Sequence, residues 1–162
     1  MNEAAKKTVL RRFPYGLYAV TVAHGGEEHG MTANWVSQAA FEPPMVVVAV
    51  ENTSKTIGMI RDAHHFAINV LCANQHYLSR QFSTPAEDKF AGVEFEEGSG
   101  GVPILGGVLA HFVCRNVRQV EAGDHVIVIG EVEHFESSEG EPLVFHSGAY
   151  RVATRHPELE TS

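Results

Sequence analysis

Cysteine is scarce in this sequence: Cys72 and Cys114 are the only two among 162 residues. They stand far apart and form no C-x-x-C pair, which excludes a zinc ribbon and a thioredoxin-type redox pair. Both lie in apolar, strand-like runs, so we expect buried free thiols.

Long apolar runs and an excess of positive charge are also missing. No stretch approaches the roughly 18 apolar residues of a membrane span. Lys and Arg number 12 against 20 Asp and Glu, a net charge of −8, which disfavours nucleic acid or an anionic membrane as partner. No apolar run follows the basic N-terminal residues, so we expect no signal peptide and a cytoplasmic protein.

Several motifs of common enzyme classes are absent. The sequence has no G-x-S-x-G elbow, no G-x-G-x-x-G turn and no P-loop. These absences exclude a hydrolase with a nucleophile elbow and nucleotide binding by a Rossmann turn or a P-loop. The ten histidines include no H-E-x-x-H and no H-x-H. A cupin-like metal site would need a second histidine beside His125 and Glu131, so no metal is predicted.

The order of the elements predicts one domain, mostly β, over residues 1–162. A short helix over about 2–12 comes first, and a polar tail over about 154–162 comes last. Between them, strand-like runs are interrupted by helical segments at 55–62 and 75–82, the second capped by Asn74. The segment HGGEEHG (24–30) reads as a turn, MVVVAV (45–50) as a strand covered on both faces, and 94–107 as an irregular excursion. With no βαβ alternation, we expect an antiparallel sheet that closes into a β-barrel and leaves no exposed edge.

The first motif with chemical content is N-T-S-K-T (52–56), at the start of the first of these helical segments. Ser54, Lys55 and Thr56 place two hydroxyls and a cation at a helix N-terminus, a combination that suits a phosphate group. The alternative is a plain helix cap.

Two further motifs suit a flat ligand. The run M-T-A-N-W-V-S (31–37) mixes polar side chains with the only tryptophan, as expected of a strand that holds a heteroatom-rich ring, or else of an edge strand with a half-exposed tryptophan. The turn Gly123-Asp124-His125 puts an imidazole at a barrel mouth, where it can donate a hydrogen bond or simply close the turn.

In this order and spacing the three motifs resemble the flavin reductase-like family of FMN-binding split β-barrels, which includes flavin reductases, flavoredoxins and ferric reductases. The similarity runs from Phe13-Pro14-Tyr15-Gly16 to Ser147-Gly148-Ala149-Tyr150. It includes the D-K-F-A-G-V and V-P-I-L-G-G-V-L-A-H-F-V-C-R segments that begin at Asp88 and Val102.

The resemblance implies a split β-barrel with Greek-key-like antiparallel strands, a homodimer, and FMN near the subunit interface, with FAD as the alternative. By position it assigns the flavin ring to Thr32, Ala33, Asn34 and Trp35, with Ser37 nearby. It assigns the phosphate end to Ser54, Lys55 and Thr56, and the ribityl-phosphate region to Lys89 and Phe90. His125, as the catalytic residue, and Tyr150 are assigned to the ring or the nicotinamide side.

The implied activity is hydride transfer from NADH or NADPH to flavin, with electrons passed to free flavin, an oxygenase partner or a ferric chelate. Many members carry Ser or Thr where this chain has Trp35, which is more similar to the flavoredoxin and ferric-reductase end of the family. Two alternatives therefore stay open: an electron-transfer flavoprotein of flavoredoxin type, reduced by a protein partner, and a non-catalytic FMN-binding protein.

Overall fold

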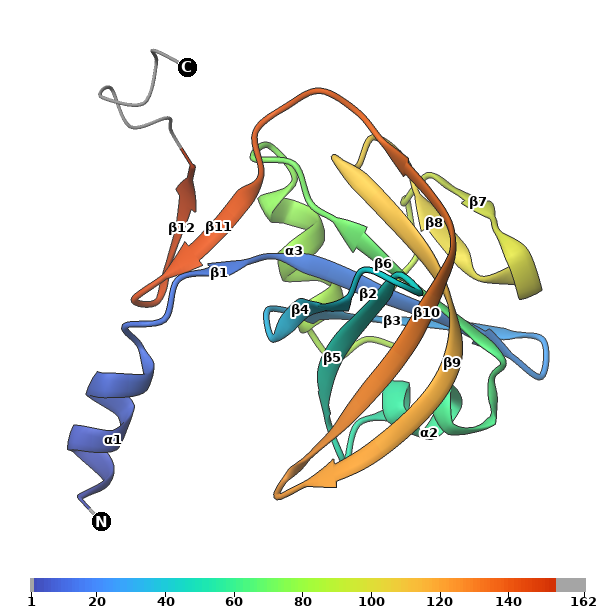
Figure 1. The fold of residues 1–162 in the computed structure, drawn as a ribbon. Helices are drawn as coiled ribbons and strands as arrows, with labels where there is room; N and C mark the ends of the chain where they lie inside the picture. The colour runs from blue at the N-terminus through green and yellow to red at the C-terminus, as the bar shows by residue number, and fades with distance from the viewer. Residues whose placement is uncertain (1, 154–162) are drawn as a thin grey trace.

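The computed structural model describes residues 2–153, which are mostly in strands (Figure 1). The polar tail predicted over 154–162 lies outside the described residues. The helices are α1 (Glu3–Leu10), α2 (Lys55–Asp62), α3 (His76–Ser83) and the short 3-10 turn η1 (Ser99–Gly101). The strands are β1 (Tyr15–Gly16), β2 (Tyr18–His24), β3 (Glu27–Ala33), β4 (Val36–Ala40), β5 (Met45–Glu51), β6 (His65–Val70), β7 (Phe95–Glu97), β8 (Pro103–Leu105), β9 (Ala110–Ala122), β10 (His125–Ser137), β11 (Leu143–His146) and β12 (Ala149–Val152).

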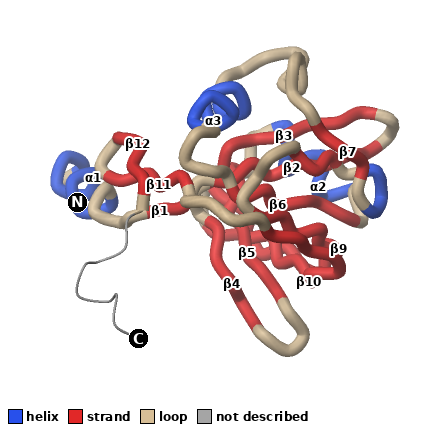
Figure 2. Tube along the Cα trace, turned by 90° about the horizontal axis from the view of Figure 1, so that it is seen from above, coloured by secondary structure: helices blue, strands red, loops and turns tan. Residues whose placement is uncertain are grey.

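Seven strands form one antiparallel sheet in the order β3-β2-β6-β9-β10-β5-β4. Its two edges, β3 and β4, are consecutive in the chain and are joined only by Asn34 and Trp35. The sheet therefore curls until its edges approach at this junction, as the views in Figures 1 and 2 show. The predicted antiparallel β fold is confirmed, but the sheet is not closed: β3 and β4 keep free edges, which is the split of the barrel.

A second, smaller sheet lies to one side of the barrel together with α1 (Figure 2). It has the order β1-β11-β12 and joins the start of the described chain to its end. Helix α1 begins at the cap residue Asn2 and has no buried residue. The C-terminal strands are thereby brought beside the β3–β4 junction.

The barrel interior is filled by alternate residues of the strands and closed at one end by α2. Val46, Val48 and Val50 of β5 are buried, whereas the residues between them are half-buried. The prediction that this strand is covered on both faces therefore holds fully for one face, and the other face is covered only in part. Helix α2 places Ile57 and Ile60 in the same core, as its spacing predicts, and Ser54 is its cap.

Two local predictions fail for identifiable reasons. Asn74 does not cap α3: the helix begins after Gln75, whose side-chain oxygen instead accepts a hydrogen bond from the Cys72 N–H at 2.9 Å. The segment 94–107 is not irregular throughout, because β7 and β8 pair within it. Ile104 of this hairpin packs on Val113 across the outer face of the sheet, so β9 is buried on both faces there.

Gly130 gives a direct test of the core packing. A Cβ at this position would lie 2.6 Å from the Phe66 ring and 2.8 Å from the Cys114 Cβ. We expect Gly130→Ala to lower the free energy of unfolding by about 1–3 kcal/mol, because a fully buried ring must move. Gly58→Ala in α2, where a Cβ has no neighbour within 4 Å, is the control and should stabilise by about 0.5–1 kcal/mol. Urea unfolding of both variants measures the difference, and a Gly130→Ala protein as stable as wild type would contradict this packing.

Within residues 2–153, no helix is both long and apolar enough to cross a membrane.

Candidate functional site

The polar residues singled out in the sequence gather in three places along β3 and its continuation through Asn34 and Trp35. The first is a cavity of about 580 Å³ between the start of β3, the start of α2 and the loop after α3, here called the lysine cavity. Its lining residues are Glu27, Glu28, His29, Lys55, Glu87, Asp88, Lys89, Phe90 and Phe95.

Two lysines line the lysine cavity, Lys55 from α2 and Lys89 from the loop after α3. Lys55 stands in the first turn of α2 and its Nζ lies 3.1 Å from the Glu27 carboxylate in an exposed ion pair. Lys89 Nζ donates a hydrogen bond of 2.9 Å to the Phe82 carbonyl, at the end of α3. Partial burial lowers the Lys89 pKa from its ordinary value. The two ammonium groups can bind an anion, in a cavity that the carboxylates of Glu27, Glu28, Glu87 and Asp88 also line.

His29 and Thr56 form a buried pair at the wall of this cavity. The His29 Nδ1 lies 3.1 Å from the Thr56 Oγ1, and the two residues are 9% and 1% exposed. Burial, with the charges of Lys89 and Lys55 adding to it, lowers the His29 pKa to about 4, against a smaller opposing effect of Glu27. His29 is therefore a neutral imidazole at pH 7.

Thr32, Ala33, Asn34 and Tyr150 meet in a second cavity, of about 260 Å³, at the other end of β3. The Thr32 hydroxyl donates to the Ser79 carbonyl of α3 at 2.6 Å, and the Ser79 and Tyr150 hydroxyl oxygens lie 3.4 Å apart. Because β3 pairs only with β2, alternate residues of β3 turn their backbone N–H and C=O groups toward the open edge. A flat ligand with hydrogen-bonding atoms on its rim fits such an edge.

The third place is the aromatic end of the site, around Trp35 and His125. Their ring centroids are 4.6 Å apart, and the His125 Nδ1 lies 2.7 Å from an Asp124 carboxylate oxygen. This hydrogen bond from His125 lowers the Asp124 pKa. Asn34, Trp35 and Ser37 share a shallow cavity of about 380 Å³ with Phe13 and Tyr15. His125 thus both closes its turn and contacts the Trp35 ring in a tilted arrangement, with 36° between the ring planes.

The structure brings together most, but not all, of the residues predicted from the sequence. Ser54, Thr56 and His125 line none of the three cavities. The Ser54 hydroxyl accepts from the Ile57 N–H at 3.3 Å as a helix cap, Thr56 forms its hydrogen bond with His29, and His125 reaches the third place only through its contact with Trp35. His29 and Ser79 were missed. His29 was missed because HGGEEHG was taken as a turn, whereas β3 already begins at Glu27 and only Gly25 and Gly26 turn the chain.

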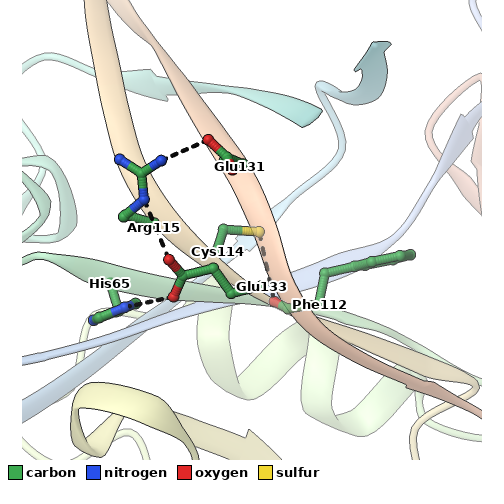
Figure 3. Close-up of polar contacts among 6 residues, drawn as sticks. All are labelled: His65, Phe112, Cys114, Arg115, Glu131 and Glu133. Atoms are coloured by element: carbon green, nitrogen blue, oxygen red, sulfur yellow. Dashed lines mark hydrogen bonds and ion pairs between the residues drawn. The ribbon is translucent and has the colours of Figure 1, made fainter. Parts of the chain in front are cut away.

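A polar network on the outside of the barrel lies apart from these cavities (Figure 3). Glu133 accepts from His65 at 2.9 Å and from Arg115 at 3.2 Å, and Arg115 also pairs with Glu131. The neighbouring Cys114 is buried, and burial and the Glu133 charge raise its pKa to about 12, so this thiol is not a nucleophile. Within the described part of the chain, no group of three or more His, Cys, Asp or Glu side chains is arranged to hold a metal ion.

Comparison with known proteins places this geometry in context. A family model described as "Flavin reductase like domain" matches residues 10–154. The chain is 36% identical over 150 residues to the reductase component of a 4-nitrophenol 4-monooxygenase/4-nitrocatechol 2-monooxygenase of Rhodococcus opacus, covering 93% of this chain and 80% of that protein. It is 34% identical over 149 residues to "FMN reductase (NADH) SmoA" of Agrobacterium fabrum, covering 92% and 85%.

Among solved structures, the NADH:FAD oxidoreductase SgcE6 of Streptomyces globisporus, in complex with NAD and FAD fragments, superposes with a TM-score of 0.90 at 30% identity and covers 98% of this chain and 96% of that one. Some matched relatives are longer, and the chain spans 47% and 45% of two of them.

Proposed function

The chain belongs to the family of flavin reductase like domains, and from this premise we propose that it is an NADH-dependent flavin reductase that binds FMN along β3. The observation that carries the proposal is the order of the three cavities. A cavity that holds two lysines among four carboxylates, a polar strand edge, and an aromatic end where His125 contacts Trp35 follow one another along a single strand and its continuation.

The residues present fit such a ligand. Lys55 and Lys89 would hold the phosphate, and the open edge of β3 near Thr32 and Ala33 would meet the rim of the flavin ring. Asn34, Trp35 and Ser37 would lie beside the ring, Phe90 beside the ribityl chain, and Tyr150 on the nicotinamide side. Ser54 and Thr56 support this site from behind, through the helix cap and through His29.

Bound FMN supplies the hydride chemistry, accepting at N5 the hydride from nicotinamide C4. The protein's part is to bind, orient and hold protons. His125 keeps its Nδ1 proton on Asp124 and leaves Nε2 for a ligand at the aromatic end. There Nε2 of the neutral ring would accept a hydrogen bond from the nicotinamide amide, whereas the protonated ring would donate Nε2–H to the negative charge of the reduced flavin.

The identity of the cofactor has a direct test. The lysine cavity offers two cations for one phosphate group, so FMN is proposed over FAD. The comparisons include both an FMN reductase and an NADH:FAD oxidoreductase. Acid release and chromatography of the bound flavin, after loading with an equimolar mixture of the two, decides between them: FAD as the main species would overturn the choice of FMN.

The activity is tested by anaerobic stopped-flow mixing of the FMN-loaded protein with NADH and, separately, NADPH. Rapid loss of the flavin's visible absorbance with NADH supports the reductase. Flavin that binds but stays oxidised with either nucleotide would favour the electron-transfer or non-catalytic alternatives. The proposed onward acceptor is an oxygenase partner that takes up reduced flavin, because the Rhodococcus opacus relative is the reductase component of a monooxygenase.

A homodimer completes the proposal. Phe41 and Phe135 are 87% and 67% exposed, and both line an apolar groove of about 390 Å³ beside the β4–β5 hairpin. Half-buried Ile127 and Ile129 add apolar surface to the outer face of β10. We expect light scattering at micromolar concentration to give twice the chain mass of 17.7 kDa. A mass near 17.7 kDa would contradict the dimer.

Glu27 provides a prediction of opposite sign to the usual loss of affinity. Its carboxylate pairs with Lys55 at 3.1 Å, so it competes with a phosphate for the same ammonium. We expect Glu27→Gln to tighten FMN binding by about 2- to 5-fold, the effect of one screened surface charge, and to leave riboflavin unchanged. Fluorescence titration with both flavins measures this, and Glu121→Gln, which removes an exposed partner of Arg61 elsewhere, is the control for net charge.

A further inference from the structure

We propose that His29 is a direct ligand of the flavin phosphate, as a neutral N–H donor, and that Thr56 is the positioning residue that fixes its tautomer. The proposal rests on the proposed function. It replaces the direct contact between Thr56 and phosphate that the sequence motif implies.

The tautomer of His29 follows from the hydrogen bond of the buried Thr56 hydroxyl. Thr56 is 1% exposed, and the single contact of its Oγ1 among the described residues is the His29 Nδ1 at 3.1 Å. Buried hydroxyl groups donate their proton where an acceptor is in reach. If Thr56 donates to Nδ1, that nitrogen carries no proton, and the neutral ring carries its proton on Nε2.

The remaining ring nitrogen is the one available to a ligand. His29 lines the lysine cavity, and its Nε2 has no hydrogen-bond partner among the described residues. The His29 Nε2 is nevertheless not a fully buried atom without a partner. Among the described residues, only the His111 Nε2 is in that position. The Nε2–H of His29 is therefore a donor at the wall of the cavity that Lys55 and Lys89 also line.

The charges around His29 predict how a bound phosphate acts on it. The groups at this cavity are Lys55 from α2, Lys89 from the loop after α3, Glu27 and Glu28 from β3, and Glu87 and Asp88 from the same loop as Lys89. Burial and the two lysines hold the His29 pKa at about 4 in the free protein. A phosphate anion offsets the lysines and accepts from Nε2–H, so it raises this pKa. Binding then takes up protons only at pH values between the free and the raised pKa of the ring, and above that range His29 stays a neutral donor.

Two substitutions of His29 separate its two nitrogens. An asparagine amide reaches the position of Nδ1, and a glutamine amide reaches the position of Nε2. We expect His29→Asn to weaken FMN about 10- to 100-fold, as for a lost charged hydrogen bond, with riboflavin changed less than about 2-fold. His29→Gln should stay within about 3-fold of wild type for both flavins. Fluorescence titration at pH 7, with thermal unfolding of each variant as the check on folding, gives both results.

Thr56 is tested by the same titrations and by a direct readout of the tautomer. Thr56→Ser keeps the hydroxyl and should match wild type, whereas Thr56→Val should weaken FMN several-fold and not riboflavin. Long-range ¹H–¹⁵N spectra should show the His29 proton on Nε2 in wild type and in Thr56→Ser, and a mixture of tautomers in Thr56→Val.

Proton uptake is measured by calorimetric titration of FMN in buffers of different ionisation enthalpy between pH 5 and 7. His29→Asn serves as the reference that carries the titration of the phosphate itself. An equal loss of FMN and riboflavin in His29→Asn, equal uptake in wild type and His29→Asn, or a wild-type proton on Nδ1 would each overturn the proposal. Absence of riboflavin and FMN binding by wild type would instead overturn the proposed function.

Discussion

Replacing His125 with alanine is expected to slow the reduction of bound FMN by NADH about 10- to 100-fold, while the melting temperature changes little. The physical reason is the position of the imidazole. Its ring contacts the Trp35 ring at a tilt, with centroids 4.6 Å apart, and its Nδ1 donates to Asp124 at 2.7 Å. One hydrogen bond that Nε2 makes to a charged or polarised ligand group corresponds to about 1.5–3 kcal/mol.

The small stability effect follows from the same contacts. The Asp124 side chain is almost fully exposed and Trp35 is partly exposed, so neither contact is a buried one. Stopped-flow reduction and thermal unfolding are measured on one FMN-loaded preparation. His134→Ala removes an exposed histidine of the same strand that pairs with Glu136 and contacts the His111 ring, and it should leave both quantities unchanged.

The opposite pattern would assign His125 to the turn alone. In that case His125→Ala reduces FMN at the normal rate and unfolds at a lower temperature. Asp124→Asn refines the result, because it weakens the hold on Nδ1 but keeps Nε2. We expect Asp124→Asn to lose part of the rate of FMN reduction. A rate as low as that of His125→Ala would mean that the imidazole acts only when Asp124 orients it.

The sequence predicted those parts of the fold that depend on neighbours in the chain. Helix α2 has its Ser54 cap and its buried Ile57 and Ile60 because each signal lies within one or two turns of the helix. The order of the sequence motifs also predicted the family and its split barrel, and membership of the family is confirmed. The junction at Asn34 and Trp35, which brings the two sheet edges together, lies within one of those motifs.

The failures share a different cause: each depends on what covers a residue from far away in the chain. The segment 94–107, predicted to be irregular, contains the β7–β8 hairpin, which is held in place by packing on the distant strand β9, with Ile104 against Val113. Thr56 carries the right chemistry for a phosphate, but β3 lays His29 over it. His29 itself is preceded by two glycines and two glutamates, a local pattern typical of a turn, and only the pairing of β3 with β2 makes it a strand residue.

Lys89→Met is expected to weaken FMN about 10- to 100-fold and to change riboflavin less than about 3-fold. Lys89 Nζ is held by the Phe82 carbonyl at 2.9 Å and is partly buried, so its charge is less screened than one on the surface. Loss of a charged partner of the phosphate corresponds to about 1.5–3 kcal/mol. Fluorescence titration with the two flavins isolates the phosphate contribution.

Lys55→Met shows which of the two lysines contributes more to the affinity for FMN. The Lys55 side chain is more exposed and must leave Glu27 before it can serve a phosphate, so its loss should cost less affinity than the loss of Lys89. Lys7→Met, in α1 and away from the cavity, changes the net charge equally and should leave both flavins unaffected. If Lys89→Met weakens FMN and riboflavin alike, Lys89 acts by holding the loop after α3 in place. Equal effects of all three substitutions on FMN affinity would mean that the lysines act only by long-range attraction. A direct contact with the phosphate would make the loss of Lys89 larger than the loss of Lys7.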